Sequence, residues 1–166
     1  MDKRRIPATD ILAAGLVLVM LINIFWFLNK RPLSENLDIE NFQGNVSISL
    51  LQSVGVESGD GIYVKDVVTT ISGDVNDDNV QKVIEVMKSI QSRKRFSGKG
   101  SILIYTTGIN TIEIEYRTKD YYQSFILTDR DNIMRSMGEK GITSYTLSDD
   151  AFEKLSKVIL EYGIVN

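Results

Sequence analysis

The chain contains, at residues 11–28, the sequence ILAAGLVLVMLINIFWFL, in which Asn23 is the only strongly polar side chain. A helix of this length measures about 27 Å at a rise of about 1.5 Å per residue. That length is close to the roughly 30 Å hydrocarbon core of a bilayer. A small domain cannot enclose a helix that is apolar on all sides. The sequence therefore predicts a transmembrane helix over residues 11–28.

The apolar segment from Ile11 to Leu28 is also typical of a membrane anchor that is not cleaved from the chain. Phe25, Trp26 and Phe27 cluster near its second end, where aromatic side chains favour the level of the lipid headgroups. A cleaved secretory signal has a shorter apolar region that ends in small residues. Here the segment ends in FWFLNKR and shows no Ala-x-Ala pattern. We expect the segment to stay attached to the mature chain as its contact with the lipid bilayer.

The basic residues that flank the segment predict its orientation. Lys3, Arg4 and Arg5 precede it, whereas only Lys30 and Arg31 follow it closely. Lysine and arginine near the ends of a span favour the cytoplasmic side. We therefore expect a single-pass protein of the cell membrane, with residues 1–10 in the cytoplasm and the C-terminal domain on the extracytoplasmic side.

Composition excludes several classes of function. The 166 residues include no cysteine and no histidine, which removes disulfides, thiolate metal sites and the commonest general base. Residues 1–31 carry five basic and two acidic side chains, a net charge of +3, and the remaining 14 basic and 20 acidic side chains give −6. An acidic domain is a poor ligand for phosphate backbones, so a nucleic-acid partner is not expected. We expect neither an enzyme nor a bound cofactor.

The residues after the apolar segment predict a short tether over 29–44 and an α+β domain over 45–166. In residues 45–50, apolar and polar side chains alternate with the period of a half-buried strand. Between Asp78 and Ser92 the apolar residues recur at helical spacing. The full expectation is an antiparallel sheet covered by two or three helices. Its strands are expected at 45–50, 62–72, 102–105, 112–116, 121–127 and 142–147, with a glycine-rich link at 55–61 and helices at 78–92, 128–138 and 152–162.

One acidic segment resembles a calcium-binding loop. Asp74, Asn76, Asp78 and Glu85 occupy the first, third, fifth and twelfth positions of such a loop. However, Asn79 stands where the loop needs glycine, and a strand rather than a helix is expected before it. The alternative interpretation is a turn at the start of a helix, where carboxylates favour the helix dipole. The sequence leaves both interpretations open.

Two sets of residues are candidates for an interaction surface. Arg93, Lys94, Arg95 and Lys99 form the densest basic cluster of the domain. Such a cluster can contact anionic headgroups or wall polymers, or it can be the solvated end of a helix.

The second set is the tyrosine pair Tyr121 and Tyr122, which lies in an expected strand. Neighbouring residues of a strand point to opposite faces, so at least one of the two rings should leave the core. Tyrosine is common at protein interfaces, although most strand tyrosines only pack.

These features together predict a membrane-anchored accessory or regulatory protein that binds other membrane or envelope proteins through its extracytoplasmic domain. The alternative is a membrane-tethered sensor of a small ligand or of Ca²⁺.

Overall fold

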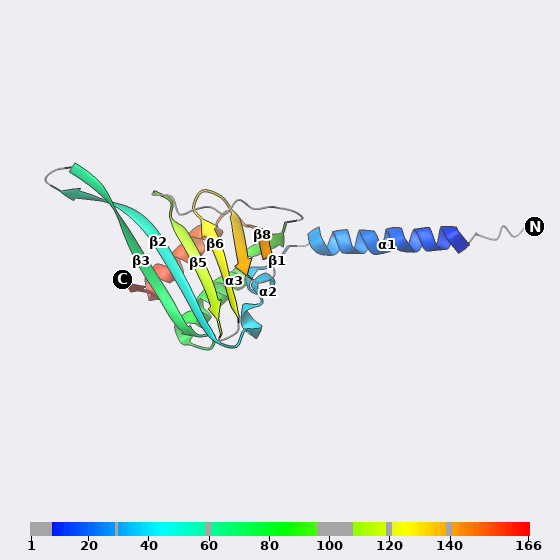
Figure 1. Cartoon of the computed structure of the whole chain (residues 1–166), viewed down its shortest axis with the longest axis horizontal. Coiled ribbons are helices and arrows are strands. Elements are labelled where there is room, and N and C mark those ends of the chain that lie inside the picture. The colour runs from blue at the N-terminus through cyan, green and yellow to red at the C-terminus, as the bar shows by residue number, and fades with distance from the viewer. Residues whose placement is uncertain (1–7, 29, 59–60, 96–107, 119–120, 139–140) are drawn as a thin grey trace, which may run out of the picture.

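The computed structural model describes residues 8–28, 30–58, 61–95, 108–118, 121–138 and 141–166. It shows an α+β fold in which a large antiparallel sheet carries helices on one face, while a long first helix projects away from the domain (Figure 1). The prediction of an α+β domain with an antiparallel sheet is confirmed. The expected strand at 102–105 lies outside the described residues.

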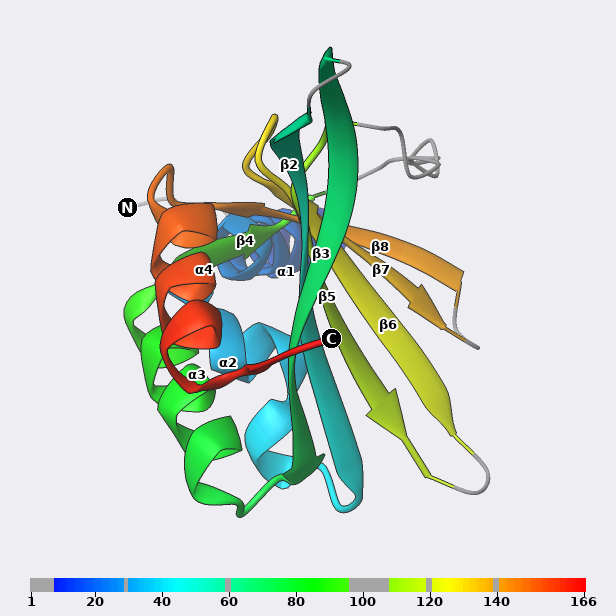
Figure 2. The same cartoon turned by 90° about the vertical axis from the view of Figure 1, so that its left-hand side faces the viewer.

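The helices are α1 (Ala8–Leu28), α2 (Leu33–Leu37), α3 (Asp78–Ser89) and α4 (Ala151–Tyr162), and a 3₁₀ turn η1 covers Ile39–Asn41. The strands are β1 (Arg31–Pro32), β2 (Asn45–Ser58), β3 (Gly61–Asp74), β4 (Gln91–Lys94), β5 (Thr111–Arg117), β6 (Tyr122–Thr128), β7 (Ile133–Gly138), β8 (Gly141–Leu147) and β9 (Ile164–Val165). Within the described residues they form one sheet in the order β1-β4-β8-β7-β6-β5-β2-β3-β9. Helices α2, α3 and α4 cover the same face of this sheet (Figure 2).

The core lies between that face and the helices. Val46, Ile48 and Leu50 of β2 are fully buried, because every second residue of the strand points toward α3 and α4. On the helix side, Val83 and Ile84 of α3 are equally buried. The amphipathic pattern of the sequence therefore produces the helix–sheet packing directly.

Aromatic rings occupy the middle of this core. Phe125 of β6 is 1% exposed, and its ring centroid lies 5.3 Å from that of Tyr116 on β5. The ring of Phe42 stacks on the ring of Tyr116, with 5.0 Å between their centroids. Burial, followed by the charges of neighbouring groups, raises the pKa of Tyr116 well above its ordinary value. The hydroxyl of Tyr116 therefore stays protonated in the folded domain.

The segment expected as a tether is part of the folded domain. Residues 31–41 form β1, α2 and η1, and Leu33, Leu37 and Ile39 are buried in the core. Leu33 and Leu37 are four residues apart, so one short helical turn places both on the same side. The tether is therefore not a free linker, and the domain begins three residues after α1 ends.

The prediction of a helix at 128–138 is wrong. Residues Ile133–Gly138 form strand β7, which pairs with β6 and β8. The residues Thr128 and Asp131, which resemble a helix start, instead close the turn between β6 and β7. Met134 and Ser136 alternate toward the core, and this period of two identifies a strand.

Strands β2 and β3 extend beyond the rest of the sheet. β5 pairs with β2 only from Asn45 to Leu51, and β9 pairs with β3 only at Thr69 and Thr70. In the described part of the chain, residues 52–58 and 61–67 consequently pair only with each other, and we call this two-stranded extension the ribbon. The glycine-rich link expected at 55–61 is therefore mostly strand. The ribbon points away from α1 (Figure 1).

Helix α1 lies outside the core. Its described side chains, residues 11–25, are all exposed, with Ile24 at 47% and Phe25 at 68%. In the part of the chain that the structure describes, no helix is both long enough and apolar enough to cross a membrane. The fold itself therefore does not support the transmembrane helix expected at 11–28.

Candidate functional site

A cleft of about 640 Å³ lies at the edge of the sheet beside the point where α1 joins the domain. Strands β4 and β8 form its wall, and the turn before β7 closes one side. In Figure 1, β1 lies at the end of the sheet that is nearest to α1, and its neighbour β4 contacts α1. The residues that line the cleft are Lys30, Gln91, Ser92, Arg93, Lys94, Arg95, Asn132, Thr146, Leu147, Ser148 and Asp149.

The two-residue strand β1 builds this cleft by pairing the chain that follows α1 with β4. Arg31 pairs with Ser92, and Pro32 pairs with Gln91. The hydroxyl of Ser92 donates to the carbonyl oxygen of Arg31 at 3.0 Å and accepts from Nδ2 of Asn36 at 2.7 Å. Ser92 is 1% exposed, so this junction is a built part of the fold. The antiparallel register therefore brings Lys30 next to β4.

The cleft is strongly basic although the domain as a whole is acidic. Lys30, Arg93, Lys94 and Arg95 all line it and are all exposed. Among the described residues, the side chains of these four form no ion pair and no hydrogen bond. Asp149 is the only carboxylate in the described lining, and its Oδ1 accepts a hydrogen bond from Nδ2 of Asn132 at 2.9 Å. The cleft therefore has a net charge of +3 and is suited to an anion.

Three of the four basic residues singled out from the sequence meet in this cleft. Arg93, Lys94 and Arg95 line it, whereas Lys99 lies outside the described residues. Lys30 joins them, and sequence reasoning missed it because a two-residue strand has no detectable periodicity. Helix α3 ends at Ser89, so the basic cluster does not form the end of this helix. Arg93 and Lys94 lie on the following strand, β4, and Arg95 comes directly after it.

The two tyrosines lie elsewhere in the sheet. Tyr122 begins β6, at the opposite end of the sheet from the last residues of β8 that line the cleft. Its side chain is 44% exposed, and its hydroxyl donates to Oε1 of Glu115 at 2.7 Å, a hydrogen bond that raises the pKa of Tyr122. Tyr121 is half-buried, lies near Phe42, and its hydroxyl donates to Oε1 of Gln123. Only Tyr122 therefore presents much surface to a partner.

Two of the residues named for the expected anchor, Ile11 and Phe25, do not line the cleft. Ile11 and Phe25 are exposed on α1. Trp26, Phe27 and Leu28 belong to the last turn of this helix, and their side chains are outside the described set.

The acidic segment that resembles a calcium loop forms a turn. Oδ1 of Asp74 accepts hydrogen bonds from the backbone and the side-chain nitrogen of Asn76 at 3.0 and 2.8 Å. The carboxylate of Asp77 accepts from the backbone N–H of Asp74 at 2.9 Å. Within the described residues, no group of three or more acidic side chains could hold a metal ion. These contacts favour the interpretation as a turn that leads into α3.

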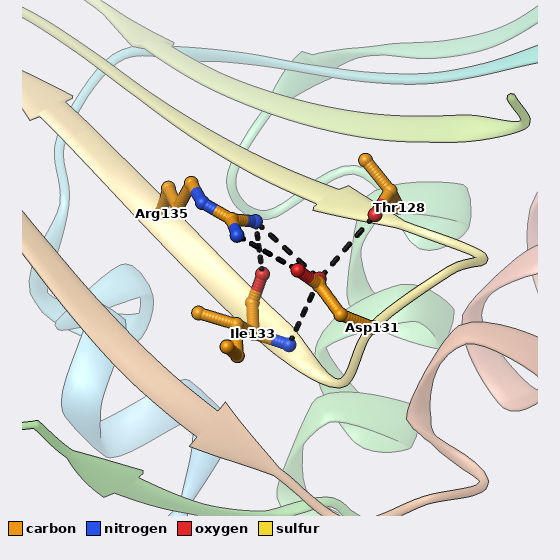
Figure 3. Close-up of polar contacts among 4 residues, drawn as sticks. All are labelled: Thr128, Asp131, Ile133 and Arg135. Atoms are coloured by element: carbon orange, nitrogen blue, oxygen red, sulfur yellow. Dashed lines mark hydrogen bonds and ion pairs between the residues drawn. The ribbon is translucent and has the colours of Figure 1, made fainter. Parts of the chain in front are cut away.

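The hydrogen-bonded turn between β6 and β7 adjoins the cleft. The carboxylate of Asp131 faces the guanidinium of Arg135, with Nη2 at 2.7 Å from Oδ2, and also accepts from the backbone N–H of Ile133 and the hydroxyl of Thr128 (Figure 3). The next residue, Asn132, holds Asp149 at the wall of the cleft. Burial raises the pKa of the Asp131 carboxyl. The hydrogen bond and the positive charge of Arg135 lower it, as do the hydrogen bonds from Ile133 and Thr128, so that the pKa is lowered overall.

We expect Asp131→Asn to lower the free energy of unfolding by about 1 kcal/mol at pH 7, because the pair with Arg135 is partly exposed. A lowered pKa in the folded state means that the carboxylate stabilises the domain above its unfolded pKa, and that this contribution is lost as the pH falls through the folded value. Thermal melting of both chains should therefore show a difference at pH 7 that shrinks below about pH 4. Asp129→Asn is the matched control, because Asp129 contacts the amide of Asn110 rather than a cation. A difference that persists unchanged at low pH would contradict the assignment.

Comparison with models of protein families, with curated proteins and with solved structures finds no match to this chain.

Proposed function

We propose that this chain is a single-pass membrane protein in which α1 anchors an extracytoplasmic accessory domain that binds other envelope proteins. The observation that carries the proposal is the separation of the two parts. The described side chains of α1 are exposed and, apart from Asn23, apolar, while the domain closes its own core without them. Exposed apolar surface on this scale is typical of an interaction with lipid or protein.

The length of α1 supports a lipid environment when its whole sequence is considered. The described side chains of residues 11–25 account for only about 22 Å of helix, but the apolar sequence continues to Leu28 and about 27 Å. The one strongly polar side chain makes an internal hydrogen bond, in which Nδ2 of Asn23 donates to the carbonyl oxygen of Val19 at 2.8 Å. An internal hydrogen bond lowers the cost of placing an amide in hydrocarbon. The basic residues Lys3, Arg4 and Arg5 support a cytoplasmic N-terminus.

The ribbon is the surface that we assign to the protein partner. Val54 and Val64 are 43% and 54% exposed and belong to neighbouring strands. Long, exposed edge strands with apolar side chains are normally covered or interrupted in monomeric proteins. An extended segment of another protein can add to such an edge through backbone hydrogen bonds. Because the ribbon points away from α1 (Figure 1), it is held clear of the bilayer in the proposed arrangement.

A single cysteine tests both the orientation and the partner surface, since the chain has none of its own. We expect Val64→Cys in the full chain to react in intact cells with a membrane-impermeant maleimide that carries a photo-crosslinker. Illumination should then join the ribbon to a membrane or envelope protein, which mass spectrometry identifies.

Two matched positions make this result specific. Asp2→Cys should stay unlabelled until the membrane is opened, because the N-terminus is proposed to lie in the cytoplasm. Leu160→Cys, which is 50% exposed on α4, should be labelled but give no adduct of the same partner. Labelling of Asp2→Cys in intact cells contradicts the orientation, and identical adducts from positions 64 and 160 contradict the role of the ribbon.

A further inference from the structure

We propose that the basic cleft binds the phosphate group of an anionic lipid headgroup, so that the domain is held against the membrane that carries its anchor. This inference rests on the proposed function, because it requires α1 to lie in the bilayer. It adds a second, chemically specific contact with lipid, made by the folded domain and not by the helix.

The position of the cleft is fixed by the chain path. Strand β1 begins three residues after α1 ends, and three residues span at most about 10 Å. The pairing of Arg31 with Ser92 continues toward Lys30 and Arg93, so both cations lie close to the end of the helix. The headgroup layer is several ångströms thick on each side of the hydrocarbon. With Leu28 at the edge of the hydrocarbon, the cleft therefore lies at the level of the headgroups.

The chemistry of the cleft suits a phosphate diester. Arg93 and Arg95 each carry a planar guanidinium, whose donors match two phosphate oxygens. In the described structure these groups and the ammonium groups of Lys30 and Lys94 have no competing partner. Asp149, the one carboxylate among the described residues of the lining, accepts a hydrogen bond from Asn132. A volume of about 640 Å³ is ample for a headgroup.

The charge of the remaining domain favours a lipid over other anions. Residues 32–166 carry a net charge of −6, so a long polyanion such as a nucleic acid would meet repulsion outside the cleft. A lipid phosphate needs only the local basic surface, and it is concentrated in the plane where the cleft lies. Basic residues near a membrane surface attract anionic lipids strongly.

The single tryptophan of the chain, Trp26, provides the test. The full chain is reconstituted in phosphatidylcholine nanodiscs with about 10% phosphatidylglycerol, and bromine atoms are placed on the acyl chains of either the phosphatidylglycerol or an equal amount of the phosphatidylcholine. Bromine quenches the fluorescence of a nearby tryptophan. We expect brominated phosphatidylglycerol to quench Trp26 at least about two-fold more than brominated phosphatidylcholine, because the cleft recruits the anionic lipid to this end of α1.

The double variant Arg93→Gln with Arg95→Gln should reduce this ratio to one. The matched control is Lys157→Gln with Arg117→Gln, which removes two exposed charges that do not line the cleft and should keep the ratio. Unchanged melting temperatures would show that both variants remain folded. Equal quenching by the two lipids, or an excess that survives in the double variant, overturns the headgroup site while leaving the anchor intact. Absence of quenching by either lipid overturns the anchor itself, and the headgroup site with it.

Discussion

Replacing Leu18 and Met20 by arginine is expected to release the full chain from lipid vesicles without changing the stability of its domain. Both residues lie near the middle of the apolar segment and are 59% and 64% exposed. An arginine at the centre of a membrane helix costs about 3 kcal/mol on the insertion scale, so the two together oppose insertion by about 6 kcal/mol. Vesicle flotation measures the effect as the fraction of protein that rises with the lipid.

The control for this prediction is Leu18→Ala with Met20→Ala, which shortens the same side chains without adding charge. That variant should float with the vesicles, because alanine is tolerated in a membrane helix. The melting temperature of the domain should be the same in both variants, since the described side chains of α1 are not part of the core. If the arginine variant floats as completely as the unaltered chain, α1 does not lie in hydrocarbon.

Phe125→Ala is expected to lower the free energy of unfolding of the domain by about 3–5 kcal/mol. The ring is almost fully buried in the core cluster and packs against Tyr116, so its removal leaves a cavity that the strands cannot close. The loss is a large part of the roughly 5–15 kcal/mol that stabilises a domain of this size. Urea unfolding of the full chain, followed by near-ultraviolet circular dichroism, measures the loss, because all seven tyrosines lie outside α1 and the contribution of Trp26 on α1 is common to the variant and the unaltered chain.

Ile142→Ala is the matched control for Phe125→Ala. Ile142 is 42% exposed and lies on the sheet face opposite the helices, because it pairs with Met137 and not with a core residue. Its truncation should cost less than about 1 kcal/mol. Equal losses from the two substitutions would show that the ring of Phe125 is not central to the core.

The sequence predicts correctly those strands and helices in which apolar residues recur at one constant spacing over several residues. The alternation in β2 and the helical spacing in α3 and α4 are long enough to identify each element and the face that it buries. The prediction of a helix at 128–138 fails because the hydrogen bond between the side chains of Thr128 and Asp131 closes a hairpin turn here. The same pair of residue types also occurs at the start of helices. Side-chain hydrogen bonds of this kind are local and occur in both settings.

The cleft could be predicted only in part. The run Arg93, Lys94, Arg95 is visible in the sequence, but its location is decided by the contact between β1 and β4, which are about sixty residues apart along the chain. A strand of two residues carries no pattern, and its pairing depends on the burial of Leu33 and Ile39 beside it. Long-range pairing of this kind is set by packing and not by local propensity.

The short connection between α1 and β1 has a mechanical consequence. A domain on a flexible linker samples many heights above a bilayer, whereas here Arg31, three residues after the end of α1, is already hydrogen-bonded into the sheet. In the proposed arrangement the ribbon is therefore presented at one constant distance from the lipid surface. The ribbon can then bind only those proteins whose docking segment lies at the same distance from the lipid surface. The short connection therefore restricts which envelope proteins can be partners.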